Sequence, residues 1–266
     1  MKLTGNTILI TGGGSGIGLA LGEAFVQRGN DVIAAGRNPQ KLSVAESHGL
    51  STVQVDMSNP ASIEALATTV RMEFPRVNVV IHNAAICQPV DFTVQGHEWI
   101  REETVATNLL GPMRLTDALL PHLLHQEQAT IIIVSSGLGF VPSARYPTYS
   151  ATKAALHSYA QSLRIQLKHT AIDVIELVPP YVQTELGGPA QATDPHAMPL
   201  GDFISEVFDI LDHNPRVEEI LVKRVQAHRF AAESGSENYD VFFQHYNEQF
   251  TFGGTCRSKW KESCAH

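Results

Sequence analysis

Residues 7–18 read T-I-L-I-T-G-G-G-S-G-I-G, and this stretch decides the fold. Its first four residues are apolar or β-branched, as in a strand buried in a parallel sheet. Gly12, Gly16 and Gly18 follow, and residues 16–29 have the apolar spacing of a helix. Glycine lets a pyrophosphate approach the backbone, and a helix N-terminus points free N–H groups at the anion. The stretch predicts a dinucleotide phosphate site, although its spacing is T-G-x-x-x-G-x-G rather than G-x-G-x-x-G; a glycine-rich turn without a ligand is the alternative.

Strand-like and helix-like runs alternate along most of the chain. The strand-like runs cover residues 7–11, 31–35, 52–56, 77–82, 130–135, 173–178 and 219–222. The helix-like runs cover residues 16–29, 39–47, 60–74, 97–126, 148–169 and 200–214. Alternation of this kind builds a parallel sheet with helices on both faces, through right-handed crossovers. The sequence therefore predicts an α/β fold of the Rossmann type, one domain with a seven-stranded, mostly parallel sheet.

Composition excludes several classes of function. The chain has 266 residues, of which 43% are hydrophobic. Its net charge of -8 disfavours electrostatic binding of nucleic acid. Its apolar stretches are strand-length and its first residues lack a signal-peptide pattern, so we expect a cytoplasmic protein without a membrane partner. The three cysteines, Cys87, Cys256 and Cys264, form no zinc pattern, and the twelve histidines show no ligand spacing. We therefore expect reduced thiols and no metal.

Two regions depart from the alternation. Residues 183–199 carry glycines and prolines with little periodicity, as in a functional lid. In residues 224–250, where we expect C-terminal helices, aromatic residues share one helical face: Tyr239, Phe242, Phe243, Tyr246 and Phe250. This helix either packs on its own domain or forms a subunit interface. The polar residues 253–266 are predicted to be a mobile tail, which leaves a domain of residues 1–252.

A second motif carries the chemistry. Residues 149–153 read Y-S-A-T-K within a helix-like run, so Tyr149 and Lys153 lie one turn apart on one helix face. A positive charge beside a phenol favours the phenolate, and the sequence predicts that Lys153 lowers the pKa of Tyr149. The pair is then an acid/base that works near neutral pH.

The two motifs together resemble the short-chain dehydrogenase/reductase family. His82-Asn83-Ala84-Ala85 is similar to the family's N-N-A-G, Asn108 matches its helix asparagine, and Ser136 lies thirteen residues before Tyr149, the usual interval. Residues 178–184, V-P-P-Y-V-Q-T, resemble its P-G-x-x-x-T segment with Pro180 in place of the glycine. The resemblance covers residues 4 to about 222. Two segments, V-P-P-Y-V-Q-T-E-L at residues 178–186 and G-R-N at residues 36–38, resemble a bacterial branch of the family. That branch is often named for D-alanylation of lipoteichoic acid.

The resemblance implies hydride transfer between a nicotinamide cofactor and a ketone or secondary alcohol. Tyr149 would be the general acid/base, and Ser136 would bond the same substrate oxygen. Lys153 would also hold the nicotinamide ribose, and Asn108 would position a water that links Lys153 to solvent. The implied cofactor-binding residues are Gly12, Ser15, Gly16, Ile17, Gly18, Arg37, Asp56, Met57, Asn83, Ala84, Tyr149, Lys153, Pro179, Val182 and Thr184.

The residues after the second strand bear on the choice of dinucleotide. An acid about twenty residues after the glycine loop marks NAD, but Gly36 and Arg37 stand there. Arg37 could pair with a 2′-phosphate, so NADP(H) is favoured over NAD(H). Ser15 lacks the second basic group that many NADP-using relatives carry. Asp56 resembles the family aspartate that contacts adenine, with a turn-forming role as the alternative.

The substrate and the rival functions are less defined. The substrate side is predicted to include apolar and aromatic residues, Phe140, Tyr146, Tyr181 and Leu186, which suit an apolar ketone or alcohol. One alternative is a catalytically silent dinucleotide-binding regulatory protein, although such proteins usually lack the tyrosine or the lysine. A sugar-nucleotide epimerase would need a larger C-terminal region. We expect a homo-oligomer, with a dimer favoured over a tetramer because the extra C-terminal helix would block one contact.

Overall fold

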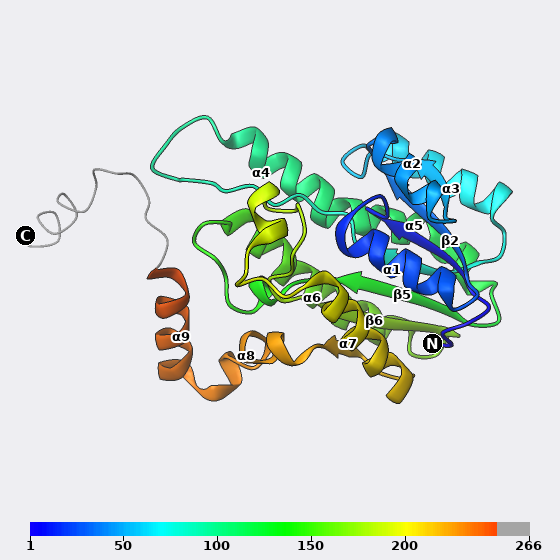
Figure 1. Ribbon diagram of the computed structural model, residues 1–266. Coiled ribbons are helices and arrows are strands. Elements are labelled where there is room, and N and C mark those ends of the chain that lie inside the picture. The colour runs from blue at the N-terminus through cyan, green and yellow to red at the C-terminus, as the bar shows by residue number, and fades with distance from the viewer. Residues whose placement is uncertain (249–266) are drawn as a thin grey trace, which may run out of the picture.

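The structure is a computed structural model that describes residues 1–248 (Figure 1). Seven parallel strands form one sheet in the order β3-β2-β1-β4-β5-β6-β7. The strands are β1 Thr7–Thr11, β2 Asp31–Gly36, β3 Ser51–Gln54, β4 Val77–His82, β5 Ala129–Val134, β6 Ile172–Val178 and β7 Glu219–Leu221. The helices are α1 Gly16–Gln27, α2 Pro39–Ser47, α3 Pro60–Glu73, α4 Glu98–Val105, α5 Gly111–Leu124, α6 Pro147–Leu167, α7 Leu200–His213, α8 Gln226–Arg229 and α9 Ser236–Glu248. The predicted single-domain Rossmann fold is confirmed.

The core has two layers, one on each face of the sheet. One layer packs α1, α2 and α7 against side chains such as Ile8 and Ile175. The other packs α3, α5 and α6 against the opposite side chains, such as Leu9 and Val174. Successive residues of a strand point to opposite faces, so the near-continuous apolar strands supply both layers. The chain reverses its direction of winding between β1 and β4, and such a point opens a crevice at the carboxyl ends of the strands.

The helix predicted over residues 97–126 is interrupted. Between α4 and α5 lies a π-helical turn, η1 Ala106–Leu110, which contains Asn108. Pro112, the second residue of α5, has no N–H to donate to the Asn108 carbonyl four residues earlier. The missing bond explains why the regular ladder shifts at this point, and π-turns of this kind are frequent at functional sites.

The region predicted to be a lid has more structure than its sequence suggests. Residues 183–199 include the short helix η3 Pro189–Thr193, and a bridge joins Val182 to Met198. Gln191 ties the segment down: its Nε2 donates to the Val182 carbonyl at 2.7 Å and to Thr184 Oγ1 at 3.2 Å, and its Oε1 accepts from the Gly187 N–H at 2.8 Å. One side chain therefore supplies the bonds that the irregular backbone cannot make itself.

The C-terminal helix packs on its own domain. Asn247 of α9 accepts from the Ala144 N–H at 2.6 Å and donates to the Pro142 carbonyl at 3.1 Å. The His228 ring packs edge-on against Phe242 and Tyr246, with 5.2 Å between ring centroids in each case. Phe250 and the predicted tail lie outside the described residues, and the predicted dimer stays a prediction. Within residues 1–248, no helix combines the length and apolar character needed to cross a membrane.

Candidate active site

The predicted site residues meet at the carboxyl edge of the sheet, in a cleft of about 740 Å³. Segments that follow β1, β4, β5 and β6 deliver most of them, because parallel strands all end at the same edge, and helix α6 delivers Tyr149 and Lys153. The cleft is lined by these predicted residues: Gly12, Ser15, Gly16, Ile17, Asn83, Ala84, Ser136, Tyr149, Lys153, Pro179, Val182, Thr184 and Leu186. Motifs from four separate parts of the sequence thus form one continuous surface.

The glycine loop leaves room for a phosphate. Gly12 and Gly16 have φ angles of 68° and 53°, which favour glycine over any other residue. A Cβ on Gly18 would come within 2.5 Å of Asn83 Nδ2, so only glycine allows α1 to start this close to β4. Ser15 precedes α1, and within the described chain its side chain forms no cap bond to the helix. The first-turn N–H groups therefore remain available to an anion. The fit between these residues and a dinucleotide pyrophosphate is good.

Asn83 and Thr11 hold the loop in place. Asn83 Nδ2 donates to the carbonyls of Thr11 and Gly12, at 3.0 and 3.3 Å. The Thr11 hydroxyl accepts from the N–H groups of Asn83 and Ala84, at 3.0 and 3.1 Å. These bonds join the ends of β1 and β4 across the crevice. His82, which replaces the first asparagine of the family motif, is buried and bonds Thr116, and burial lowers its pKa to about 4. It is therefore neutral at pH 7.

The predicted catalytic residues Ser136, Tyr149 and Lys153 line the same cleft as the glycine loop. Tyr149 and Lys153 occupy one face of α6, with the Lys153 ammonium 5.5 Å from the centre of the Tyr149 ring. Lys153 Nζ donates to the Val134 carbonyl at the end of β5, at 2.7 Å. Ser136 follows β5, and its hydroxyl accepts from the Leu138 N–H at 3.1 Å. The same hydroxyl lies close enough to the Tyr149 phenol to act on its pKa. Serine, tyrosine and lysine therefore converge on one spot.

Burial sets the protonation of this pair. Burial raises the pKa of Tyr149 well above its usual range, against the lowering effect of the Ser136 bond. Burial also lowers the pKa of Lys153 to about 8. The prediction that Lys153 lowers the pKa of Tyr149 is therefore wrong for the protein alone. Both groups have left water, and removal from water disfavours the charged form of each more than the neighbour favours it.

Asn108 supports the site from behind and does not line the cleft. Its Oδ1 accepts from the Ile86 N–H and its Nδ2 donates to the Ile86 carbonyl, both at 2.9 Å. Nδ2 also donates to Thr152 Oγ1 at 3.3 Å. The π-turn orients the side-chain amide of Asn108, and the hydrogen bonds of that amide connect the segment after β4 to α6. The water relay to Lys153 that the family resemblance implies stays a prediction.

The residues predicted for the adenosine end lie at the ends of β2 and β3. Arg37 is largely exposed and pairs with Glu103 of α4 at 3.1 Å. Asp56 accepts from the N–H and hydroxyl of Ser58, at 2.9 and 2.7 Å, which is the turn-forming role. Burial raises the pKa of Asp56, but the bonds from Ser58 and the charge of Arg37 outweigh it and leave that pKa lowered. Met57 is buried beside Gly111. Contact of these residues with adenosine stays a prediction.

The predicted substrate residues do not all lie in the cleft. Leu186 lines the cleft, and the exposed Tyr181 donates to Asp194 at 3.0 Å within the lid. Tyr146 precedes α6 beside the cleft. Phe140 packs elsewhere: its ring centroid lies 4.6 Å from that of His157 and 4.9 Å from Arg229 Cζ. Phe140 follows the helical turn Gly137–Gly139 and is not among the residues that line the cleft.

Cys87 and Lys41 are among the cleft residues that the sequence does not predict. Cys87 follows the Asn83 motif and faces Lys153, and burial raises the pKa of its thiol to about 12. The sequence predicts only a reduced thiol at Cys87, although its position four residues after Asn83 indicates a place in the cleft. Lys41 of α2 lines the other end and pairs with Glu185 of the lid at 3.2 Å. No local pattern marked it, since the ion pair joins residues 144 apart in sequence.

Comparison with known proteins identifies the family. The model of the short chain dehydrogenase family matches residues 6–195. The "uncharacterized oxidoreductase DltE" of Bacillus subtilis is 36% identical over 255 residues, 94% of this chain and 99% of that protein. A short-chain dehydrogenase from Sphingobium yanoikuyae in complex with NADPH is 27% identical and covers 86% of this chain and 92% of its own, with a TM-score of 0.74. One from Burkholderia phymatum in complex with NAD has the same TM-score at 20% identity, covering 88% and 95%. Both motifs, the sheet order and these matches agree: the chain belongs to the short-chain dehydrogenase/reductase family, with nicotinamide-dinucleotide-dependent oxidoreductases as its relatives.

Proposed function

We propose that the protein is a carbonyl reductase and secondary alcohol dehydrogenase that acts on apolar ketones or alcohols. The observation that carries this proposal is the meeting of Ser136, Tyr149 and Lys153 in one cleft that the glycine loop also lines. A protein that only sensed a dinucleotide would have no use for a buried phenol and a buried ammonium, both of which are costly to remove from water.

The protein's part in the reaction is proton management at one oxygen. A bound nicotinamide supplies or accepts the hydride. In ketone reduction Ser136 donates a hydrogen bond to the carbonyl oxygen, which fixes the substrate and stabilises the charge that develops there. Tyr149 donates its proton to that oxygen, so its O–H bond breaks as the alcohol O–H bond forms. A raised pKa does not prevent this step, because an alkoxide is a much stronger base than a phenolate. Lys153 then faces the phenolate that remains.

The cofactor preference and the substrate class follow from the lining. Arg37 and Lys41 are basic side chains near the adenosine end, and each now pairs with an acid that a 2′-phosphate could replace. These two basic side chains support NADP(H) over NAD(H). Near Tyr149 the cleft offers Ile86, Cys87 and Leu186, which suit an apolar substituent. No arginine lines the cleft among the described residues, which disfavours phosphorylated substrates.

The test is a pair of titrations followed by a substrate panel. NADPH and NADH are titrated into the protein by fluorescence, and aryl and alkyl ketones are then screened by loss of the reduced nicotinamide absorbance. We expect tighter binding of NADPH and turnover of at least one apolar ketone, with Tyr149→Phe as the inactive control. Tight binding without turnover of any ketone or alcohol would favour the regulatory alternative and contradict the proposal.

A further inference from the structure

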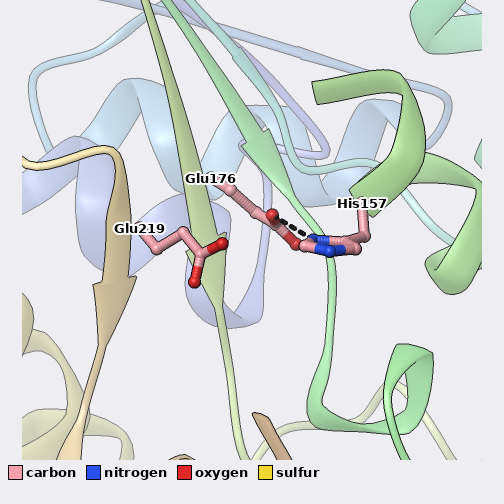
Figure 2. A group of neighbouring side chains, drawn as sticks. All are labelled: His157, Glu176 and Glu219. Atoms are coloured by element: carbon pink, nitrogen blue, oxygen red, sulfur yellow. Dashed lines mark hydrogen bonds and ion pairs between the residues drawn. The ribbon is translucent and has the colours of Figure 1, made fainter. Parts of the chain in front are cut away.

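A buried carboxylate lies behind the catalytic lysine. Figure 2 shows Glu176 of β6 between His157 of α6 and Glu219 of β7. One side-chain nitrogen or oxygen from each of the three lies within 4.8 Å of the others. His157 is four residues after Lys153, so Tyr149, Lys153 and His157 follow one another along one face of α6. The three residues, called here the Glu176 cluster, therefore continue the line of catalytic side chains into the protein.

Glu176 is the member of the cluster that needs an explanation. Its side chain is 0% exposed, and it interrupts the apolar strand β6. Oε2 bonds His157 Nδ1 at 2.7 Å, but Oε1 has no hydrogen-bond partner within residues 1–248. A carboxylate without water is retained in a protein interior only when other charges or bonds compensate it. The imidazole of His157 bonds only one of the two oxygens, so a further positive charge nearby is needed to compensate the carboxylate.

The charges around the cluster show which cation serves Glu176. Arg229 of α8 donates to both oxygens of Glu219, at 2.7 and 3.0 Å, so these two compensate each other. The other cation is Lys153, one helical turn before His157 on α6. Its Nζ bonds the Val134 carbonyl of β5, and Glu176 on the adjacent strand pairs with Ile133, the residue before Val134. Burial lowers the pKa of Lys153, and the charges of Cys87 and Glu176 oppose that fall. Two acids and two bases therefore balance. A divalent metal ion in the cluster would leave excess positive charge beside Lys153 and Arg229, so we do not interpret the cluster as a metal site.

Groups from four segments surround Lys153. Tyr149 lies one turn earlier on α6, β5 offers the Val134 carbonyl, and β6 offers Glu176. The segment after β4 offers Cys87, whose thiol has a pKa raised by burial to about 12 and is uncharged at pH 7. Arg145 faces Cys87 as a further positive charge. Among these groups, Glu176 is therefore the carboxylate that acts on Lys153.

This inference rests on the proposed reaction and deepens it. We propose that Glu176, held in place by His157, is the buried counter-charge that keeps Lys153 an ammonium and is thereby a positioning residue for proton transfer at Tyr149. After Tyr149 has given its proton to the substrate oxygen, the phenolate is stabilised only if Lys153 carries its charge. Glu176 and His157 exchange no proton in this step. Their effect reaches Tyr149 entirely through the charge of Lys153.

The test measures Lys153 directly in the full chain without cofactor or substrate. The pKa of Lys153 is determined by NMR titration of protein labelled with ¹³C and ¹⁵N in lysine, and Lys153→Met assigns its signal. We expect Glu176→Gln to lower the pKa of Lys153 by about one unit, the effect of one nearby charge. Glu218→Gln is the matched control, because Glu218 is exposed at the same sheet edge and pairs with Arg164 at 3.5 Å. It should leave the titration unchanged.

A pair of His157 variants separates charge from mere packing. His157→Gln keeps an N–H donor for Glu176 and should preserve the titration of Lys153. His157→Leu removes the donor, so the buried carboxyl takes up a proton and the pKa of Lys153 should fall toward that in Glu176→Gln. Circular dichroism checks that each variant folds. If Glu176→Gln does not fold, the comparison of the two His157 variants tests the proposal.

Three outcomes would overturn the proposal. One is an unchanged Lys153 titration in folded Glu176→Gln, and another is the same titration in both His157 variants. The third is binding of one equivalent of Mn²⁺ by the wild type but not by Glu176→Gln, which would make Glu176 a metal ligand. Because the titration uses no substrate, an error in the proposed reaction would appear separately, as a wild type that turns over no ketone although its Lys153 titration shifts as expected.

Discussion

Lys153 Nζ donates a hydrogen bond to the Val134 carbonyl oxygen at 2.7 Å, and this bond fixes the geometry of the catalytic residues. It directs the ammonium toward the end of β5, next to the residue that leads into Ser136. The ammonium of Lys153 lies over the ring of Tyr149 and is not bonded to its hydroxyl in the described structure. In the protein alone, the lysine is thus held by a strand of the sheet, and Ser136 acts on the pKa of the tyrosine.

The first prediction concerns Tyr149 and Ser136. Tyr149→Phe removes the proton that the substrate oxygen takes, so kcat should fall below detection while the Kd of the reduced dinucleotide stays within about twofold. Ser136→Ala removes one stabilising bond and should lower kcat by about 100-fold. Steady-state assays and fluorescence titration measure both. Substantial ketone reduction by Tyr149→Phe would show that another group donates the proton.

A second prediction is a pH dependence. Burial lowers the pKa of Lys153 to about 8, so the free enzyme loses the ammonium as pH rises through that value. The kcat/KM for ketone reduction should therefore be constant below pH 8 and fall above it, since kcat/KM reports groups of the free enzyme. A profile that stays level to pH 10.5, the usual pKa of a lysine, would mean that the ammonium is not required.

The third prediction is a conflict between stability and function at Lys153. Its pKa falls from 10.5 when unfolded to about 8 when folded, so folding disfavours the ammonium. The cost is complete below pH 8 and disappears as pH rises from 8 to 10.5, and it amounts to roughly 3 kcal/mol. Lys153→Met removes it, although the Val134 carbonyl loses its donor at a cost of about 1 kcal/mol.

We therefore expect Lys153→Met to be inactive but to melt a few degrees higher at pH 7, with a smaller advantage near pH 10. Calorimetry across this pH range measures the effect. The control is Lys168→Met on the exposed end of the same helix, which should change the melting temperature little at any pH. A Lys153→Met protein that is less stable at pH 7 would contradict the burial argument.

The sequence predicted those parts of the protein that depend on local residues. The seven strands, the glycine loop and the spacing of Tyr149 and Lys153 follow from short-range patterns, and the structure places them as expected. The π-turn at Asn108 depends on Pro112 and on the pairing of Asn108 with Ile86, which no periodicity records. The protonation of Tyr149 depends on burial, which appears only when α6 is packed on the sheet.

Other features were missed although signals for them existed. Glu176 is the one charged residue in the apolar run V-I-E-L-V, and a charge in a buried strand needs a partner. His157 stands at helical spacing from Lys153, so the two residues could have been connected to the same face. The ion pair of Lys41 and Glu185 had no such signal, because nothing in either segment specifies how the lid folds over α2.

A fourth prediction tests how closely the glycine loop is packed. A Cβ on Gly18 would overlap the Gly12 carbonyl oxygen and Asn83 Nδ2. Gly18→Ala should therefore cost about 1–3 kcal/mol of stability and weaken dinucleotide binding, because α1 must move away from β4. Gly201→Ala in α7 is the control: no described atom lies within 4 Å of its Cβ, and it should gain about 0.5 kcal/mol. Thermal unfolding and fluorescence titration measure both. Wild-type affinity in Gly18→Ala would rule out tight packing at this point.

The last prediction concerns the choice of dinucleotide. Arg37 is exposed and held by Glu103 at 3.1 Å, so it can turn toward a 2′-phosphate at small cost. Arg37→Asp should raise the Kd of NADPH at least about tenfold and leave that of NADH unchanged or lower, because it replaces a charge-assisted bond with repulsion. Glu103→Gln should act in the opposite direction by releasing Arg37. The control is Arg76→Asp, an exposed arginine that pairs with Asp31 at the far end of the sheet. If the ratio of the two Kd values is the same in Arg37→Asp and Arg76→Asp, Arg37 does not contact the phosphate, and Lys41 becomes the basic residue to replace next.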